Sequence, residues 1–241
     1  RQVAEMLEKI PNREIATKLL EEEDHVIRCF AAKTLADSES LHTKLALDEH
    51  LSVRIIAAEN SNDEKLISSL IDDNHSAVRK AAISTASRKE MKLNESVLRN
   101  ALKSGDSSLR SLIGSMAVKL GGDILEIACG DSDPKVRKSI ADSLREYVDV
   151  VDSRIENIAT ISPEIIVRWL RMRYDADSNS LRWSMIEDTK INQRTRSKLI
   201  EQMDGRRDID LERLAKITQD DSSLVSMAAK NLEKSIEELG E

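Results

Sequence analysis

The chain has 241 residues, of which 40% are hydrophobic, 2% aromatic and 34% charged, and its net charge is −7. Small aliphatic side chains must therefore form the core, and the acidic balance excludes a protein whose whole surface binds nucleic acid. No apolar run reaches the ~18 residues that span a bilayer, and the N-terminus shows no secretory segment. We expect a cytoplasmic protein with no membrane partner and two reduced thiols, Cys29 and Cys129.

One helix pattern recurs along the whole chain, anchored on an arginine that follows an aliphatic residue, except at Arg196, which follows Thr195. The anchors are spaced by about 28 residues on average. In chain order they are Arg28, Arg54, Arg79, Arg110, Arg137, Arg168 and Arg196, with Val225 in the eighth place. The clearest copy starts at Asp133, a helix-capping residue, and Pro134, which fits the first helical position. Small or aliphatic pairs follow each anchor three and four residues later, except after Arg168.

A second amphipathic segment of two or three turns lies between successive anchors. These segments are residues 14–20, 41–47, 64–71, 96–102, 123–128, 155–161, 181–186 and 211–217. Neither helix of a pair can bury its apolar stripe alone, so stacking must supply the missing face. Turns are expected at Gly121-Gly122 and at residues 204–208, and no linker divides the chain. We expect a single repeat domain over residues 1–241.

The recurring unit resembles the HEAT-like repeat family in its short form, over essentially the whole chain. The resemblance rests on an acidic residue four positions before an aliphatic–Arg pair, as in Asp24 to Arg28 and Asp133 to Arg137. It implies an all-α, right-handed superhelical α-solenoid of about eight two-helix repeats, with the anchored helix as the inner helix. It also implies a scaffold that binds a protein or peptide partner on its inner-helix face.

The aligned arginines have two interpretations, a basic track for phosphates or a part of the architecture. Acidic residues such as Asp24, Asp106 and Asp133 stand four positions before their anchors, which predicts ion pairs within one helix. The resemblance implies in addition that the ladder joins each repeat to the next. We favour the architectural interpretation.

The histidines give no support to a metal site. His25, His50 and His75 stand beside acids at helix starts. The HEAT-like deoxyhypusine hydroxylases bind iron through His-Glu pairs at such positions, but this chain contains no His-Glu dipeptide. Ligands must converge on one ion, which stacked helix ends do not ensure. We therefore expect no metal and no cofactor, with the histidines as exposed polar residues.

Residues 165–213 depart from the rest of the chain. They contain both tryptophans and nine arginines, and Lys and Arg outnumber Asp and Glu by 12 to 10 between residues 160 and 216. Two interpretations stay open. The tryptophans fill the core of an irregular sixth unit, or the section is a patch that contacts a partner. The predicted partner-binding residues are Arg168, Trp169, Arg171, Arg173 and Trp183.

Catalytic motifs are missing from the chain: it has no Walker loop, dinucleotide fingerprint, His-Glu-x-x-His or Gly-x-Ser-x-Gly. We therefore expect a non-enzymatic scaffold for a protein or peptide and predict no catalytic residue. The alternative is a nucleic-acid-binding or DNA-base-repair module that acts through residues 165–213, since HEAT-like alkylpurine DNA glycosylases use a similar mixture of Arg and aromatics. An oligomeric state does not follow from the sequence.

Overall fold

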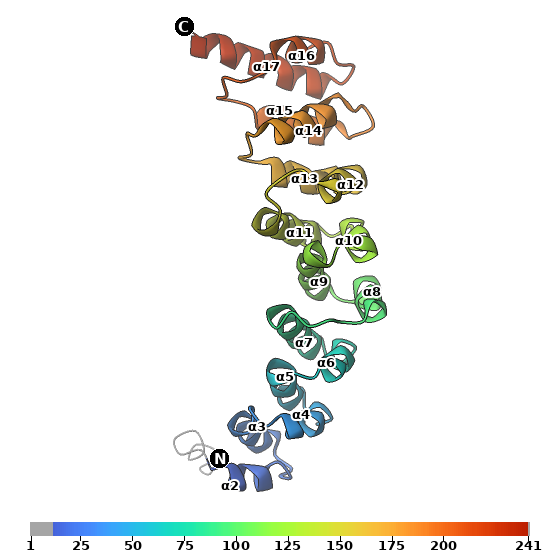
Figure 1. Cartoon of the computed structure of the whole chain (residues 1–241), viewed down its shortest axis with the longest axis vertical. Coiled ribbons are helices and arrows are strands. Elements are labelled where there is room, and N and C mark those ends of the chain that lie inside the picture. The colour runs from blue at the N-terminus through green and yellow to red at the C-terminus, as the bar shows by residue number, and fades with distance from the viewer. Residues whose placement is uncertain (1–11, 241) are drawn as a thin grey trace. The chain divides into compact units, whose positions relative to one another are not determined.

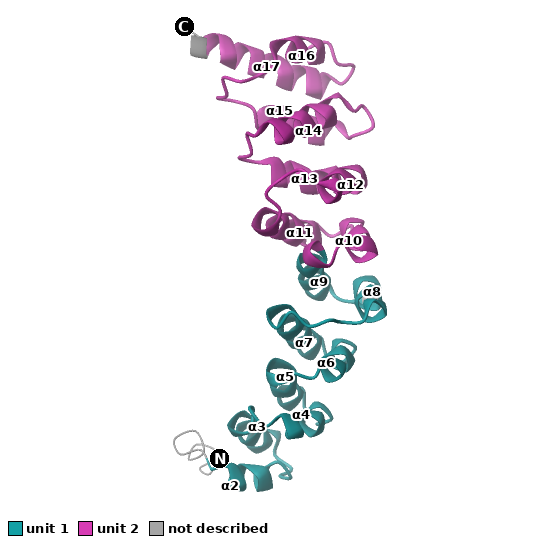
Figure 2. Cartoon of the chain, in the orientation of Figure 1, with its two compact units in different colours: residues 1–117 teal, residues 118–241 magenta. Residues whose placement is uncertain are grey.

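The computed structural model describes residues 12–240, and over these residues it consists of 16 α-helices without a strand. The all-α prediction is therefore confirmed. The chain divides into two compact units, residues 1–117 and 118–241 (Figure 2). The single repeat domain expected over residues 1–241 stays a prediction. The prediction that the N-terminus has no secretory segment concerns residues that lie partly outside the described ones.

In the first unit, helices α3, α5 and α7 pack in a row, while α2, α4 and α6 each pack on the helix that follows (Figure 1). The helices in chain order are α2 (Arg13–Leu19), α3 (His25–Thr34), α4 (Glu39–Ala46), α5 (Leu51–Asn60), α6 (Glu64–Ile71), α7 (Ser76–Arg88), α8 (Glu95–Ser104) and α9 (Ser107–Leu120), whose last turn belongs to the second unit. The odd-numbered helices carry the anchors, and the even-numbered ones overlap the predicted intervening segments, although α14 (Ala176–Glu187) begins five residues before its segment.

The second unit repeats this arrangement. Helices α11, α13, α15 and α17 pack in a row, and each contacts the even-numbered helix before it (Figure 1). In chain order the helices are α10 (Gly122–Cys129), α11 (Pro134–Tyr147), α12 (Ser153–Ile161), α13 (Pro163–Leu170), α14 (Ala176–Glu187), α15 (Gln193–Glu201), α16 (Leu211–Ile217) and α17 (Ser223–Gly240). The two predicted turns are confirmed, and Gly121 and Gly205 occupy them with φ values of 70° and 75°.

Side-chain caps explain where many of the helices begin. The Asp133 carboxylate accepts a hydrogen bond from the Lys135 backbone N–H at 2.8 Å, and Pro134 is the first helical residue. The Nδ1 atoms of His50 and His75 accept in the same way from Ser52 and Ala77. Each cap satisfies a backbone donor that has no partner within its own helix. These two histidines therefore act as helix caps.

The predicted small and aliphatic pairs form the centre of the core. Almost all of them are buried: Ala31, Ala32, Ala57, Ala58, Ala82, Ile83, Ile113, Ile140, Ala141, Leu199, Ile200 and Ala229. Small side chains at these positions let neighbouring helices approach closely and fill the space between them without voids. The apolar pattern of the sequence thus corresponds to the layer where the helices meet.

The unit anchored at Arg168 lacks this pair because its helix is short. Helix α13 ends at Leu170, so Arg171 and Met172 lie beyond it and are exposed. Met172 has a φ of 69°, in the left-handed region that residues with a Cβ rarely adopt. The interruption of the pattern in the sequence therefore marks a helix end.

Replacing Met172 by glycine should stabilise the protein by about 0.5–1 kcal/mol, because glycine adopts this backbone conformation without strain. The Met172 side chain is 71% exposed, so little packing is lost. Urea unfolding measures the change. The matched control is Met227→Gly in α17, also exposed but within a helix, which should destabilise the protein. Equal destabilisation by both substitutions would contradict the expectation.

Four of the anchor arginines hold the turn that precedes their own helix. In each case Nη1 donates to the backbone carbonyls six and five residues earlier, over 2.7–3.1 Å. The arginines with this pair of bonds are Arg28, Arg54, Arg79 and Arg137. A planar guanidinium offers several donors in a fixed geometry, so one side chain can donate hydrogen bonds to two backbone carbonyls of the turn.

Two of these arginines, Arg28 and Arg54, also reach forward to the next turn with two hydrogen bonds each. Arg28 binds the Asp48 carboxylate through two bonds of 2.8 and 3.0 Å, and Arg54 binds Asp73 in the same way. The predicted pairing of Arg28 with Asp24 is therefore wrong: Asp24 caps its helix through Val26 N–H, and the arginine pairs with an acid 20 residues later. The architectural interpretation of these arginines agrees with their contacts.

Acid should weaken these buried pairs. Burial raises the pKa of Asp73, but hydrogen bonds from Arg54 and from the His75 backbone outweigh it and hold the pKa below its ordinary value. The pKa values of Asp48 and Asp220 are lowered in the same way. A carboxylate with a depressed folded pKa contributes stability above its unfolded pKa of about 3.9 and loses it as the pH falls further.

The Tm should therefore decrease steeply when the pH is lowered below about 4. The variant Arg54→Met/Asp73→Leu removes one pair and keeps its volume, so its Tm should fall less steeply over the same range. Thermal unfolding followed by circular dichroism at a series of pH values measures both slopes. Identical slopes would show that this pair contributes nothing to acid sensitivity.

Candidate partner-binding groove

Three neighbouring helices of the second unit place exposed cations on one shared surface. Lys138 and Arg145 lie seven residues apart on α11, and Arg194 and Lys198 lie four apart on α15. Arg168 on α13 and Arg171 at its end lie three apart between them. Residues with these spacings share one face of a helix. Because α13 packs against both α11 and α15, the three faces adjoin.

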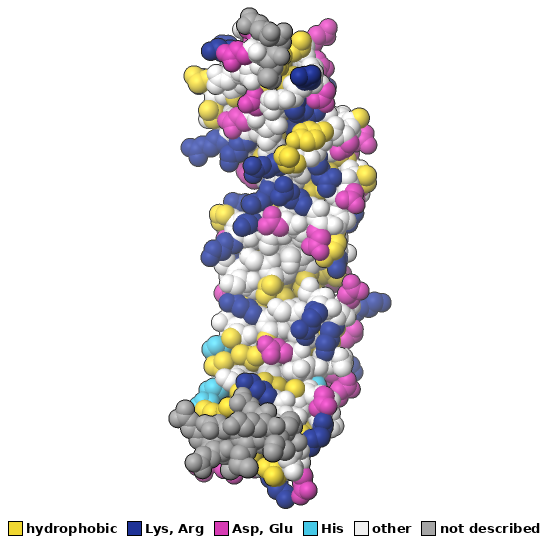
Figure 3. Space-filling model, turned by 90° about the vertical axis from the view of Figure 1, so that its left-hand side faces the viewer, with side chains coloured by type: hydrophobic (Ala, Val, Ile, Leu, Met, Phe, Trp, Pro, Cys, Tyr) yellow, Lys and Arg dark blue, Asp and Glu magenta, His cyan; other side chains and the backbone are white. Residues whose placement is uncertain are grey.

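A groove runs between these cations. One part, of about 480 Å³, is lined by six Lys and Arg side chains and a single carboxylate, that of Glu164. A second part, of about 590 Å³, shares Glu164, Val167 and Lys198 with the first and adds Arg194. Figure 3 shows Lys and Arg side chains gathered on this face, where α13 and α15 lie. We call this surface the basic groove.

Most cations of the basic groove have no internal partner. Among the described residues, no hydrogen bond or ion pair engages the side chains of Lys138, Arg145, Arg171, Arg194 or Lys198. Arg168 is the exception on α13, since its Nε lies 3.3 Å from the Asp142 carboxylate. Exposed like charges that no acid neutralises create a positive local potential, which attracts anionic groups. The groove can therefore bind negative charge.

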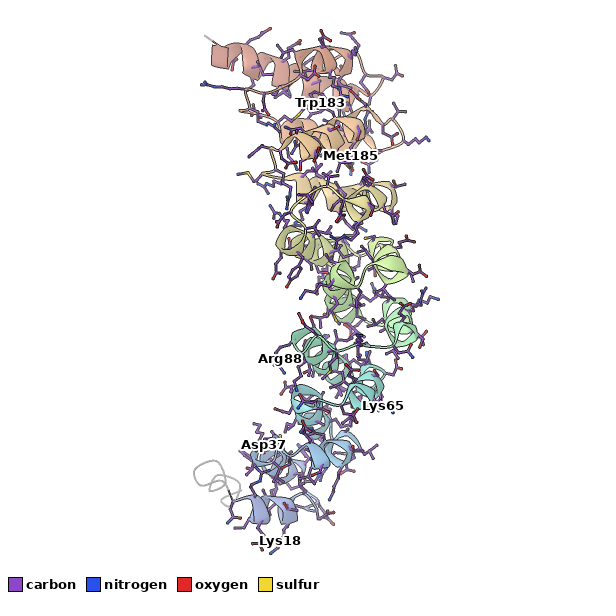
Figure 4. The ribbon with its side chains drawn as sticks, in the orientation of Figure 1. Lys18, Asp37, Lys65, Arg88, Trp183 and Met185 are labelled. Carbon is purple, nitrogen blue, oxygen red and sulfur yellow. The ribbon has the colours of Figure 1, made fainter. Side chains whose placement is uncertain are left out.

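The two tryptophans of this section belong to the core. Trp169 is completely buried, and its Nε1–H donates to the Val148 carbonyl at 3.1 Å. Trp183 on α14 is 6% exposed, and Met185, two residues later on the same helix, is also buried. Figure 4 labels both residues. A buried ring does not contact a partner unless the fold opens. Burial favours the core-packing interpretation of both tryptophans over their predicted role as partner contacts.

Arg173, another predicted contact, is used by the fold as well. Its guanidinium lies 4.0 Å from the centre of the Trp169 ring and donates to the Val148 and Asp149 carbonyls at 2.7 Å. A cation over an aromatic face is attracted by the ring. Of the five predicted contacts, Arg168 and Arg171 are the ones that line the basic groove.

Arg182 braces the irregular turn after α13 from inside. Its Nη2 donates to the carbonyls of Leu170 and Arg173 at 2.8 and 2.9 Å, and Nη1 donates to Asn179. Burial, together with the nearby charge of Arg206, lowers the pKa of Arg182 to about 10, which leaves it protonated at neutral pH. The turn carbonyls thus take the place of an acidic partner.

The repeat pattern of the sequence does not single out Lys138, Arg145 or Lys198, because these residues lie outside the positions that recur from unit to unit. The helical spacing of seven between Lys138 and Arg145 was a signal in the sequence. It predicts that the two share a face, but not that this face adjoins the cations of two other helices.

Other chemistry is sparse in the part of the chain that the structure describes. It contains no group of three His, Cys, Asp or Glu placed to hold a metal ion, and no helix long and apolar enough to cross a membrane. The rings of His25 and His50 stack with their centres 3.7 Å apart. Burial raises the pKa of the Cys129 thiol to about 12, so it is unreactive at neutral pH.

Comparisons with known proteins do not assign a family. No family model matches the chain, and no curated protein matches it. Among solved structures, it is similar to the crystal structure of an engineered protein, with a TM-score of 0.46 and 16% sequence identity. That match covers 99% of this chain and 74% of the engineered one.

Proposed function

We propose that the protein is a non-enzymatic HEAT-like repeat scaffold that binds a protein or peptide partner on the face of its odd-numbered, inner helices. In this proposal the chain is a right-handed superhelical α-solenoid of about eight two-helix repeats. The observation that carries the binding role is the basic groove, a hollow lined by cations on and beside α11, α13 and α15, most of which have no internal partner among the described residues. Arg168 and Arg171 are its partner-binding residues on and beside α13.

The packing of the helices supports the scaffold part of the proposal. Each odd-numbered helix of a row contacts the next, and the anchor arginines link consecutive turns. Repeats that contact only their neighbours present long, regular surfaces to a partner. The missing catalytic motifs agree with a function that lies in this surface.

Site-specific photo-crosslinking tests the proposal. A photoreactive amino acid replaces Arg171 or Arg194 in the basic groove, or Lys65 or Lys216 on the even-numbered helices α6 and α16 as the matched controls. We expect a discrete protein adduct from the groove positions and none from the controls. Equal adducts from all four positions, or adducts from the controls alone, would contradict binding on the inner-helix face.

The basic groove also favours a second candidate, a nucleic-acid-binding or DNA-base-repair module that acts through residues 165–213. Phosphate groups bind to clustered Lys and Arg, and such binding weakens steeply with salt. Fluorescence anisotropy with labelled DNA tests this candidate. No detectable binding at low salt would exclude it.

A further inference from the structure

We propose that the basic groove binds a short acidic segment of a protein partner. This inference rests on the proposed function and names the chemistry of the partner. Its starting point is the contrast between the groove and the chain: six cations and one carboxylate line the first part of the groove, while the net charge of the protein is −7. Four of these cations, Lys138, Arg145, Arg171 and Lys198, have no internal hydrogen bond or ion pair within the described residues. A ligand that carries carboxylates neutralises them.

The size of the groove suits a short segment. It crosses three packed helices, and helix axes pack about 8–10 Å apart, so it is roughly 20 Å long. An extended peptide advances about 3.3 Å per residue, so roughly six residues fill this length. An acidic peptide of ten residues therefore covers the whole length of the groove.

Base stacking finds little support on this surface. Nucleic-acid grooves without sequence preference usually combine cations with exposed aromatic rings. Both tryptophans are buried here, and the exposed aromatic residue near the groove, Tyr174, is faced by the Arg206 guanidinium at 4.9 Å from its ring centre. Base stacking at the groove would therefore fall to Tyr174, which is 51% exposed but already faces Arg206, and not to the tryptophans.

The experiment measures binding of a fluorescein-labelled decaglutamate peptide by anisotropy at low salt. The groove variant is Arg145→Glu/Lys198→Glu, and the control variant, Lys65→Glu/Lys216→Glu, makes the same change in net charge on the even-numbered helices. We expect decaglutamate to bind the wild type and the control variant with equal affinity. Its affinity for the groove variant should be lower by a factor of roughly ten or more. Decaglutamine should not bind. Because the substituted side chains are exposed and unpaired, circular dichroism should show folded variants; if Arg145→Glu/Lys198→Glu does not fold, Arg171→Gln/Arg194→Gln replaces it.

Three outcomes would overturn the inference. The first is that decaglutamate does not bind to the wild type, and the second is that it binds equally well to the wild type and to the groove variant. The third is that a ten-residue oligothymidylate binds about tenfold more tightly than decaglutamate, which would assign the groove to nucleic acid. The photo-crosslinking experiment separates this inference from the proposed function. Partner adducts from Arg171 or Arg194 positions without decaglutamate binding would leave the scaffold intact and remove only the acidic partner.

Discussion

Replacing Trp169 by alanine should destabilise the protein by about 3–5 kcal/mol, a large part of the stability of an ordinary domain. The ring is completely buried between helices, so its removal leaves a cavity that the neighbouring side chains fill only in part. It also leaves the Arg173 guanidinium without the aromatic face that it covers at 4.0 Å. Urea unfolding followed by circular dichroism measures the loss.

The variant Trp169→Phe serves as the control, because it keeps an aromatic ring but has no indole N–H. The Val148 carbonyl that accepts from Trp169 also accepts from Arg173, so it keeps a donor in this variant. We expect a clearly smaller destabilisation than for alanine, about 1–2 kcal/mol. Decaglutamate binding to Trp169→Phe should equal that of the wild type. A stable Trp169→Ala variant that fails only in partner binding would instead make this tryptophan a contact residue.

Replacing Arg54 by alanine should cost about 3 kcal/mol or more, because it leaves a buried carboxylate without its cation. The side chains of Arg54 and Asp73 are 11% and 9% exposed, and two hydrogen bonds join them. The substitution also removes the donor for the Asp48 and Glu49 carbonyls. Two consecutive turns therefore lose their connection at one position.

A double-mutant cycle separates the pair from its parts. The variants Arg54→Ala, Asp73→Ala and the combination are compared by urea unfolding, and the combination should cost less than the sum of the single substitutions. Lys18→Ala is the control, since the Lys18–Glu14 pair is exposed at 75% and 83% and should contribute little (Figure 4). Additive effects would show that Arg54 acts only through the turn carbonyls.

The contrast between Arg28 and Arg171 shows which charge contacts were predictable. The anchor position of Arg28 follows from the repeat pattern, and so does its place on a helix. The local sequence predicts that Arg28 pairs with Asp24 on the same helix, and this prediction is wrong. The true partner, Asp48, lies 20 residues later in the chain. Arg171 was predicted to contact a partner, but its membership in a groove with Lys138 and Lys198 depends on two helices outside its own.

The helix starts and the core pattern were determined by the sequence alone. A cap such as Asp133 acts on a backbone N–H two residues later, and an apolar stripe repeats within one or two turns, so both are local. The burial of Trp169 and Trp183 and the gathering of exposed cations in the basic groove were decided by the tertiary structure. The physical reason is that burial and local potential depend on all neighbouring side chains, and here those neighbours come from helices about 30 residues apart in the chain.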